Sequence, residues 1–363
     1  MKRSAQEVKY TDMTFIEFIK AAEKQGKLFA LYWSRIVFAR NHFHTSLLTK
    51  IQANLSGGFL ADQWILYELD RKKRKDYLSE FDWYRSRYID EPYDYMLNNK
   101  VIATEVFGQY IRMPKIYLIK SKGIVFDYDN NILNTDQALE YIQGKGDVVL
   151  KPFSKGQGNG VHRITFDADG FALDGTPTGK EPIRKKLDRW ENWYLTETIV
   201  QHPYAAALYD QTVNTIRIIT LRAPQDGKIK VFFAVQRVGT SHTLPVDNAS
   251  QGGLVCKVDL SSGRLSQARS LHEQTVYERH PDSGVRFEDV VIPDWQGMKD
   301  EILALANRFP YLSFVAWDVV KLPDGKNCVI EANASSGVNI IQLWGGQRNG
   351  ELGNFYRYHH VIR

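Results

Sequence analysis

The sequence predicts an α+β protein that begins with a helix-rich region, and three observations lead to this fold class. Apolar residues recur at helical spacing from residue 15 to about residue 98. Beyond residue 146, segments with strand-like patterns outnumber those with helical patterns. The spacing of these strands is typical of hairpins, which favours antiparallel pairing over a doubly wound sheet of βαβ units.

Three helices are predicted in the N-terminal region. The first starts near Phe15, and the others span Phe29–Phe43 and Leu60–Tyr77. The third ends in the basic run Arg71–Lys75, which we interpret as solvated cations favoured by the negative end of the helix dipole. A patch that binds a charged glycan is the alternative interpretation of this run.

Shorter elements follow in the rest of the chain. Helices are predicted at Val101–Tyr110, Thr135–Ile142 and Trp295–Arg308. Strands are predicted at Lys115–Ile119, Asp147–Lys151, Val161–Phe166, Trp193–Glu197, Thr215–Leu221, Lys228–Val238 and Leu254–Val258, with a hairpin after the last helix.

Length and composition set the class of protein. A chain of 363 residues predicts two or three packed subdomains, and 43% hydrophobic with 25% charged residues is typical of a globular protein. A net charge of +5 by itself argues for neither a nucleic-acid partner nor a membrane partner. Cys256 and Cys328 predict buried thiols in a reducing compartment. Without an apolar signal core or a stretch of transmembrane length, we expect a cytoplasmic protein with no integral membrane segment.

The hairpin near the C-terminus carries a candidate metal site. If the turn is centred on Asp324-Gly325, opposed residues have numbers that sum to 649, which places Asp318 opposite Glu331. Asn333 lies two residues further on and shares their face. Opposed carboxylates repel, so a hard divalent cation bound by these three side chains explains the pattern. A loop of odd length would break this register, and a solvent-facing hairpin is the alternative.

A polar, glycine-rich segment follows the strand Asp147–Lys151. Glycines at alternate positions let backbone amides approach a polyanion, and Lys151 ends the strand where its ammonium reaches phosphates. The segment comprises Ser154, Lys155, Gly156, Gln157, Gly158, Asn159 and Gly160. It is neither a Walker loop nor a Rossmann fingerprint, because both require a helix directly afterwards. A glycine-rich hairpin without a ligand is the alternative.

The strand Trp193–Glu197 ends at a carboxylate. An apolar strand with this ending predicts that Glu197 and neighbouring backbone groups face an adenine edge. A glutamate on an edge strand in water is the alternative interpretation.

Taken in order, these motifs resemble the ATP-grasp superfamily over about residues 97–345. The matching elements are Asn99-Lys100, Pro114-Lys115, Leu150-Lys151-Pro152 with its glycine-rich segment, Thr196-Glu197-Thr198-Ile199, Asn214-Thr-Ile-Arg217, Arg237, Asn248-Ala-Ser-Gln-Gly252-Gly253, Asp318 and Glu331-Ala-Asn333. The arginines and the Asn248–Gly253 run are similar to those of ligases that add glutamate to a protein tail. The N-terminal region and residues 213–220 are similar to sugar-transfer-associated ATP-grasp proteins.

The resemblance implies a role for each matched residue. Lys100 and Lys151 would contact the nucleotide phosphates, with residues 154–160 closing over them. Glu197, Thr198 and Ile199 would hold adenine, and Asp318, Glu331 and Asn333 would bind Mg²⁺, or Mn²⁺ as an alternative. Arg217 and Arg237 would meet the γ-phosphate and the acyl group. The acidic ribose-binding residue usual after the adenine contact is missing from Gln201–Tyr204, which leaves His202 or Asp210 as candidates.

The resemblance also implies domain organisation and activity. It predicts a helix-rich region (1–98) and an ATP-grasp fold whose two α+β subdomains, 99–200 and 201–363, clasp ATP. The implied reaction joins a small-molecule, glycan or peptide carboxylate to an amine acceptor through an acyl phosphate, in cell-surface polysaccharide or peptide biosynthesis. Phosphotransfer to a hydroxyl and a nucleotide-binding scaffold without turnover are the alternatives. The sequence carries no signal for an oligomeric state.

Overall fold

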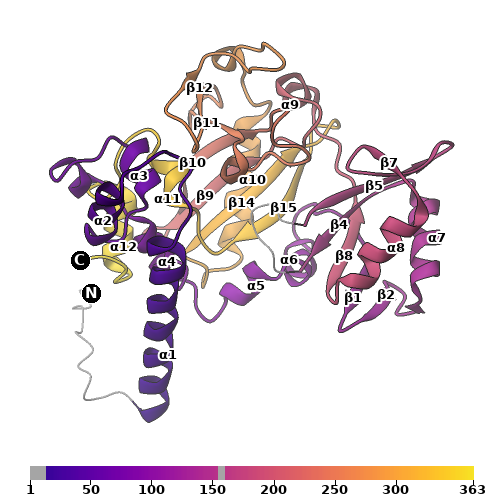
Figure 1. The fold of residues 1–363 in the computed structure, drawn as a ribbon, viewed down its shortest axis with the longest axis horizontal. Helices are drawn as coiled ribbons and strands as arrows, with labels where there is room; N and C mark the ends of the chain where they lie inside the picture. Colours follow the sequence, from indigo (N-terminus) through magenta and orange to yellow (C-terminus); the bar gives the residue numbers. More distant parts are fainter. Residues whose placement is uncertain (1–13, 154–159) are drawn as a thin grey trace. The chain divides into compact units, whose positions relative to one another are not determined.

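The computed structural model describes residues 14–153 and 160–363. The chain forms two compact units, of which the first comprises Met1–Ser86 with Gly346–Arg363 and the second Arg87–Gly345. Figure 1 shows the helices and strands of both units along the chain. In the described part of the chain, the helices all lack the combination of length and apolar character that crossing a bilayer requires.

The first unit is built from helices. They are α1 (Phe15–Tyr32), α2 (Leu47–Leu55), α3 (Ala61–Leu66), α4 (Glu80–Ser86) and α12 (Glu351–Tyr358). Thr14 starts α1 with a capping box, because its hydroxyl accepts the Glu17 amide at 3.3 Å and its own amide donates to the Glu17 carboxylate at 2.8 Å. The C-terminal helix joins this unit through Tyr356, whose hydroxyl lies 3.0 Å from the Ser86 hydroxyl.

Two of the predicted N-terminal helices are wrong in extent. The segment predicted as a separate helix at Phe29–Phe43 continues α1 to Tyr32 and then widens into a π-helical turn, Trp33–Val37. The helix predicted at Leu60–Tyr77 stops at Leu66, because Glu68 has a left-handed φ of 52° that ends a right-handed helix. The basic run therefore does not lie at an α-helix C-terminus but in turns and a 3₁₀ turn, Lys73–Asp76.

The second unit contains two sheets whose strand pairs are all antiparallel. The first has the order β3-β2-β1-β8-β4-β5-β6-β7. Its strands are β1 (Ile116–Ser121), β2 (Ile124–Asp127), β3 (Ile132–Leu133), β4 (Asp147–Pro152), β5 (His162–Asp167), β6 (Gly170–Leu173), β7 (Thr176–Thr178) and β8 (Trp193–Glu197). Helices α7 (Thr135–Lys145) and α8 (Lys180–Arg189) share one core with this sheet (Figure 1), which includes Leu139, Leu187 and Leu195.

The second sheet has the order β13-β12-β11-β10-β9-β14-β15. Its strands are β9 (Ile216–Arg222), β10 (Ile229–Val238), β11 (Leu254–Val258), β12 (Leu265–Arg269), β13 (Val276–Tyr277), β14 (Phe314–Lys321) and β15 (Asn327–Asn333). Helices α6 (Lys100–Phe107) and α10 (Trp295–Asn307) share its core, where the Phe107 and Trp317 rings meet edge to face with centroids 5.2 Å apart. Short helices α5 (Asp94–Asn98), α9 (Pro203–Leu208) and α11 (Val338–Gln342) complete the unit.

The α+β class, the antiparallel pairing and the helical N-terminal region are confirmed. The compact units divide the chain at positions other than those predicted. Residues 87–98 belong to the unit that holds both sheets, and residues 346–363 belong to the helical unit rather than to a subdomain spanning 201–363. A contact between segments far apart in sequence explains the second difference, because Arg348 donates to the Asp82 carboxylate at 3.1 Å.

Candidate functional site

A row of charged residues crosses one face of the second sheet. Arg217 on β9 lies opposite Asp318 on β14, and Asp318 lies opposite Glu331 on β15. Arg237 on β10 is two residues from Val235, the partner of Arg217, so its side chain lies diagonally on the same face. The other face of these strands carries Ile218, Trp317 and other core residues. The charged row therefore lies on the face of these strands opposite to this core.

The predicted pairing of Asp318 with Glu331 is confirmed, but the hairpin reaches it differently. Near the turn the register is shifted by one residue, because Lys321 pairs with Asn327 around a loop of odd length. Gly325 has a φ of 83°, as a three-residue loop with a left-handed last residue requires. A β-bulge past Val319 takes up the extra residue and restores the pairing of Asp318 with Glu331.

Asp318 is held between two arginines. It is 2% exposed and accepts hydrogen bonds from Arg217 Nε at 2.8 Å, Arg217 Nη2 at 2.7 Å and Arg237 Nη1 at 3.2 Å. Burial favours the neutral carboxyl, but the two guanidinium groups outweigh burial and lower the pKa of Asp318. Asp318 is therefore a charged carboxylate at neutral pH.

Asp247 completes this group and was missed by the sequence analysis. It is 4% exposed, pairs with Arg237 Nη2, and accepts the Thr215 amide at 2.7 Å and the Thr215 hydroxyl at 2.5 Å. The Asn248–Gly253 turn fixes its position, because a Cβ at Gly253 would lie 2.5 Å from the Asp247 carbonyl oxygen. We name Arg217, Arg237, Asp247 and Asp318 the arginine–aspartate cluster.

A second group, named the lysine–glutamate cluster, consists of Lys100, Lys151 and Glu331. Lys100 is the first residue of α6, which Asn99 caps by accepting the two amides that follow Lys100, and its ammonium lies 3.2 Å from the Glu331 carboxylate. Lys151 lies on β4 opposite Tyr194. Burial, and next the positive charge of Lys100, lower the pKa of Lys151 to about 8. Among the described residues, no carboxylate forms an ion pair with Lys151.

Glu197 is held at the end of β8. Its Oε1 accepts the Lys115 amide at 2.5 Å and lies 2.5 Å from Arg112 Nη2. Thr198 donates its hydroxyl to the Asp147 carboxylate at 2.7 Å, while Ile199 is half-buried in the connection that follows. Within the described residues, no backbone hydrogen bond uses the amide of Thr198 or Ile199. These amides and the second Glu197 oxygen remain available to a ligand.

The remaining predicted residues are placed only in part. Ser154, Lys155, Gly156, Gln157, Gly158 and Asn159 lie outside the described residues. Gly160 has a φ of 81°, and a Cβ there would lie 3.2 Å from the Trp190 ring, so glycine suits this position. Of the two ribose candidates, His202 caps α9 by accepting the Tyr204 amide at 3.1 Å, whereas Asp210 is exposed and accepts from Gln211 at 2.8 Å.

The donor groups on β14 and β15 fit a hard divalent cation. Asp318, Glu331 and Asn333 carry only oxygen ligands toward one face of one hairpin, because Ala316, two residues before Asp318, pairs with Asn333. The Asn333 amide nitrogen donates to the Ala316 carbonyl at 3.4 Å, and its amide oxygen accepts no hydrogen bond among the described residues. Asp318 would have to share its oxygens with Arg217, so Glu331 and Asn333 are the more accessible ligands.

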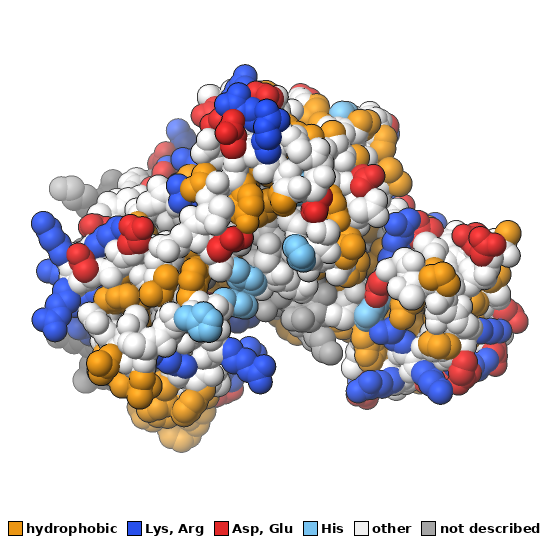
Figure 2. Space-filling model, turned by 45° about the horizontal axis from the view of Figure 1, so that its top comes forward, with side chains coloured by type: hydrophobic (Ala, Val, Ile, Leu, Met, Phe, Trp, Pro, Cys, Tyr) orange, Lys and Arg blue, Asp and Glu red, His pale blue; other side chains and the backbone are white. Residues whose placement is uncertain are grey.

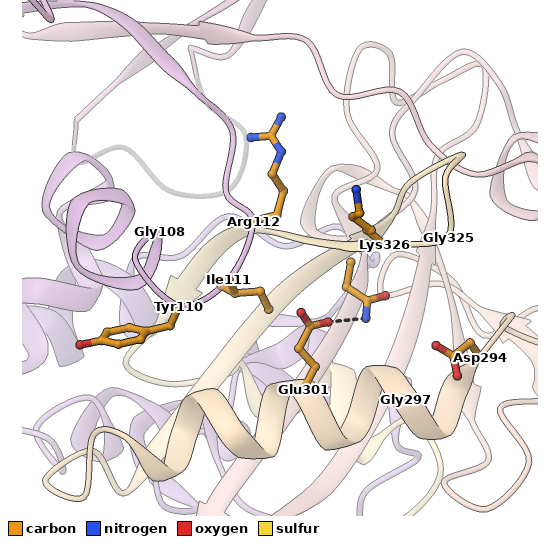
Figure 3. A pocket seen from close by; sticks show the side chains of 10 residues that line it. Gly108, Tyr110, Ile111, Arg112, Asp294, Gly297, Glu301, Gly325 and Lys326 are labelled. Atoms are coloured by element: carbon orange, nitrogen blue, oxygen red, sulfur yellow. Dashed lines mark hydrogen bonds between the residues drawn. The ribbon is translucent and has the colours of Figure 1, made fainter.

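A cavity of about 560 Å³ lies elsewhere in the second unit. Figure 3 shows its lining residues, which come from the loop after α6, from α10 and from the β14–β15 turn. Its polar groups already have partners, because Glu301 accepts the Asn327 amide at 2.6 Å and Arg112 pairs with Glu197. None of the predicted site residues in the described part of the chain lines it. The candidate site is therefore the pair of charged clusters and not this cavity.

Comparison with known proteins identifies the family. A family model described as sugar-transfer associated ATP-grasp matches residues 81–351, about three quarters of the chain. No curated protein sequence matches this chain.

Three solved structures are similar at low identity. They are N5-carboxyaminoimidazole ribonucleotide synthetase (purK) with ADP at 11% identity and a TM-score of 0.37, the ATP-grasp ligase PsnB with a minimal precursor at 13% and 0.36, and D-alanyl-alanine synthetase A from Vibrio cholerae at 12% and 0.42. The matches cover 67%, 68% and 74% of this chain but only 46%, 55% and 66% of those chains. Family membership rests on the sequence match over residues 81–351 and on the order of its motifs. The chain belongs to the sugar-transfer associated ATP-grasp family.

Proposed function

We propose that the chain is an ATP- and Mg²⁺-dependent carboxylate–amine ligase that forms an amide bond through an acyl phosphate. Its substrates would be ATP, a small-molecule, glycan or peptide carboxylate, and an amine. Membership of the ATP-grasp family supports ATP as a substrate, and the sugar-transfer association of the family supports a place in cell-surface polysaccharide or peptide biosynthesis. The alternative function is phosphotransfer to a hydroxyl, for which the same phosphate-binding residues would serve.

The observation that carries this proposal is the excess of positive charge in the lysine–glutamate cluster. Two ammonium groups, those of Lys100 and Lys151, interact there while only Glu331 forms an ion pair. Holding an ammonium where its pKa falls to about 8 costs free energy that a polyanion would recover. The cluster thus suits a triphosphate. The Thr198 and Ile199 amides beside Glu197, which make no backbone hydrogen bond within the described parts of the chain, suit the edge of a base.

The chemistry assigns a task to each cluster. A carboxylate is a poor electrophile, so its oxygen attacks the γ-phosphorus of ATP, the bond to the bridging oxygen breaks, and ADP leaves. Lys100 and Lys151 would bind the phosphates and align them for this transfer. The amine then attacks the acyl carbon, loses a proton and expels phosphate. Mg²⁺ bound by Asp318, Glu331 and Asn333 would supply positive charge that offsets the charge of the phosphates.

Arg217 and Arg237 retain donor capacity for the reacting groups. The Arg217 side chain is 14% exposed although it holds Asp318. The Nε of Arg237 is buried and has no hydrogen-bond partner among the described residues. An oxyanion that forms beside these arginines would accept hydrogen bonds from the unused N–H groups. Such preorganised donors stabilise developing negative charge.

A product-resolved screen tests the proposal. The protein is incubated with ATP, Mg²⁺ and pools of acids and amines, and ADP release and product mass are measured. We expect ADP release that needs both an acid and an amine, with a product lighter by one water than the two together. A product that retains phosphate would replace the ligase with a phosphotransferase. If the chain were a scaffold without turnover, no combination of acid and amine pools would lead to ATP consumption.

A further inference from the structure

Helix α1 exposes an apolar stripe. Phe15, Phe18, Ile19, Phe29 and Trp33 recur at helical spacing on one side of the helix, and their side chains are 43–77% exposed. Another side of the same helix faces the core of the first unit, where Leu28 is 5% exposed. Leu28 is the only buried side chain among the described residues of α1, so packing within the first unit does not explain the exposed apolar stripe.

Helix α2 repeats the pattern. Leu47, Leu48, Ile51 and Leu55 lie on one side of the helix and are 45–80% exposed, while Ala53 is fully buried on another side. Ten of the 22 exposed large hydrophobic residues in the described chain lie within residues 15–55. This concentration marks an interaction surface rather than the scattered apolar residues of an ordinary surface. We name α1, α2 and the segment between them the amphipathic face.

The amphipathic face is also basic. Residues 14–56 contain six lysines and arginines but two glutamates, an excess of four positive charges in a chain whose net charge is +5. Figure 2 shows hydrophobic side chains gathered beside Lys and Arg at the lower left, over the N-terminal helices. Helices that lie in the interface of a bilayer have this composition, with phenylalanine, tryptophan and leucine next to lysine and arginine.

We propose that the amphipathic face docks the protein on an anionic membrane surface, with α1 and α2 lying in the plane of the headgroups. Buried apolar side chains would supply the attraction at short range, and the positive excess would add attraction to anionic headgroups. A second copy of this chain fits less well, because it would bring a further four positive charges against the first four. This inference does not depend on the proposed ligase activity.

Vesicle flotation of the full chain tests the docking. The vesicles contain phosphatidylcholine alone or with phosphatidylglycerol, at low and at high salt. We expect flotation with the anionic vesicles at low salt, several-fold less at high salt, and little with phosphatidylcholine alone. Phe18→Ser with Phe29→Ser should reduce binding by roughly 10- to 100-fold, since two partly inserted rings are lost.

Two further variants separate the contributions. Ile132→Ser removes an equally exposed apolar side chain (69%) from β3 and should float like the parent protein. Lys20→Gln with Arg35→Gln leaves the apolar stripe intact and should lower binding at low salt while having little effect at high salt. No flotation with anionic vesicles, or binding unchanged by the double phenylalanine variant, would overturn the proposal. Light scattering that reveals a dimer disrupted by that same variant would assign the face to a second copy instead.

Discussion

The two charged clusters of the second unit differ in how completely their charges are paired. In the arginine–aspartate cluster, two guanidinium groups and two carboxylates form four ion-pair contacts, and Asp318, Asp247 and Arg237 are 2–6% exposed. In the lysine–glutamate cluster, the one carboxylate, Glu331, pairs with Lys100 and not with Lys151, and the Glu331 side chain is 26% exposed. In the first cluster each charge has an opposite charge beside it, and of its buried side-chain nitrogen and oxygen atoms only the Nε of Arg237 lacks a hydrogen-bond partner among the described residues. The second cluster leaves a positive charge that a ligand would neutralise.

Because of this difference, we expect the arginine–aspartate cluster to contribute mainly to the stability of the fold and the lysine–glutamate cluster mainly to ligand binding. Removing one member of a buried, paired group leaves an uncompensated charge and destabilises the fold. Removing an unpaired buried cation relieves a desolvation penalty and weakens only what that cation binds.

Asp318→Asn should lower the free energy of unfolding by about 3 kcal/mol or more, because it leaves Arg217 and Arg237 buried without their shared carboxylate. Chemical denaturation measures this loss. Asp324→Asn is the matched control from the same hairpin, since Asp324 is half exposed and its bond to the Lys326 amide can be made by asparagine. If both variants unfold alike, the cluster does not support the fold.

Lys151→Ala should weaken ATP binding by roughly 10- to 100-fold, the cost of losing a charge-assisted contact to phosphate. Its stability should stay equal or rise, because the ammonium is held in a site that lowers its pKa to about 8. Calorimetric titration with ATP and Mg²⁺ gives the affinity, and thermal unfolding gives the stability. Lys73→Ala removes an exposed ammonium of the first unit and should change neither. Equal effects of the two substitutions would refute the phosphate role of Lys151.

The pKa of Lys151 also predicts how ATP affinity depends on pH. A folded-state pKa of about 8 keeps the ammonium protonated at pH 7, and the charge is lost as pH rises through 8, while an unfolded chain keeps it to roughly 10.4. ATP affinity should therefore fall by up to about tenfold between pH 7 and 9. Over the same range the stability of the free protein should begin to rise, since the unfolded state binds more protons. Lys151→Ala should lose both trends.

More of the two sheets than of the charged clusters could be predicted from the sequence. Strand patterns are local, so β8 and β11 were predicted with the observed bounds. The opposition of Asp318 and Glu331 was also predicted, although a bulge and an odd loop compensate each other to produce it. A turn motif does not show a bulge, because bulges depend on how the whole ladder packs.

The features that could not be predicted from the sequence depend on contacts between residues far apart in the chain. Arg217 meets Asp318 because β9 and β14 pair across about a hundred residues, and no local pattern encodes that pairing. Asp247 precedes a recognised glycine motif, but its importance comes from burial beneath Arg237. The early end of α3 follows from a left-handed Glu68, a residue type without a sequence signal for that conformation.

Glu331→Gln tests the residue at which the two clusters meet. Glu331 lies opposite Asp318 of the arginine–aspartate cluster, but its carboxylate pairs with Lys100. Its contact with Lys100 is partly exposed, so the free energy of unfolding should fall by less than about 1 kcal/mol. Removing one negative charge beside two lysines should strengthen metal-free ATP binding a few-fold. If Glu331 is a cation ligand, the same substitution should weaken ATP binding in the presence of Mg²⁺. Calorimetric titration with and without a chelator measures both, and an increase under both conditions would mean that Glu331 serves only as the counter-ion of Lys100.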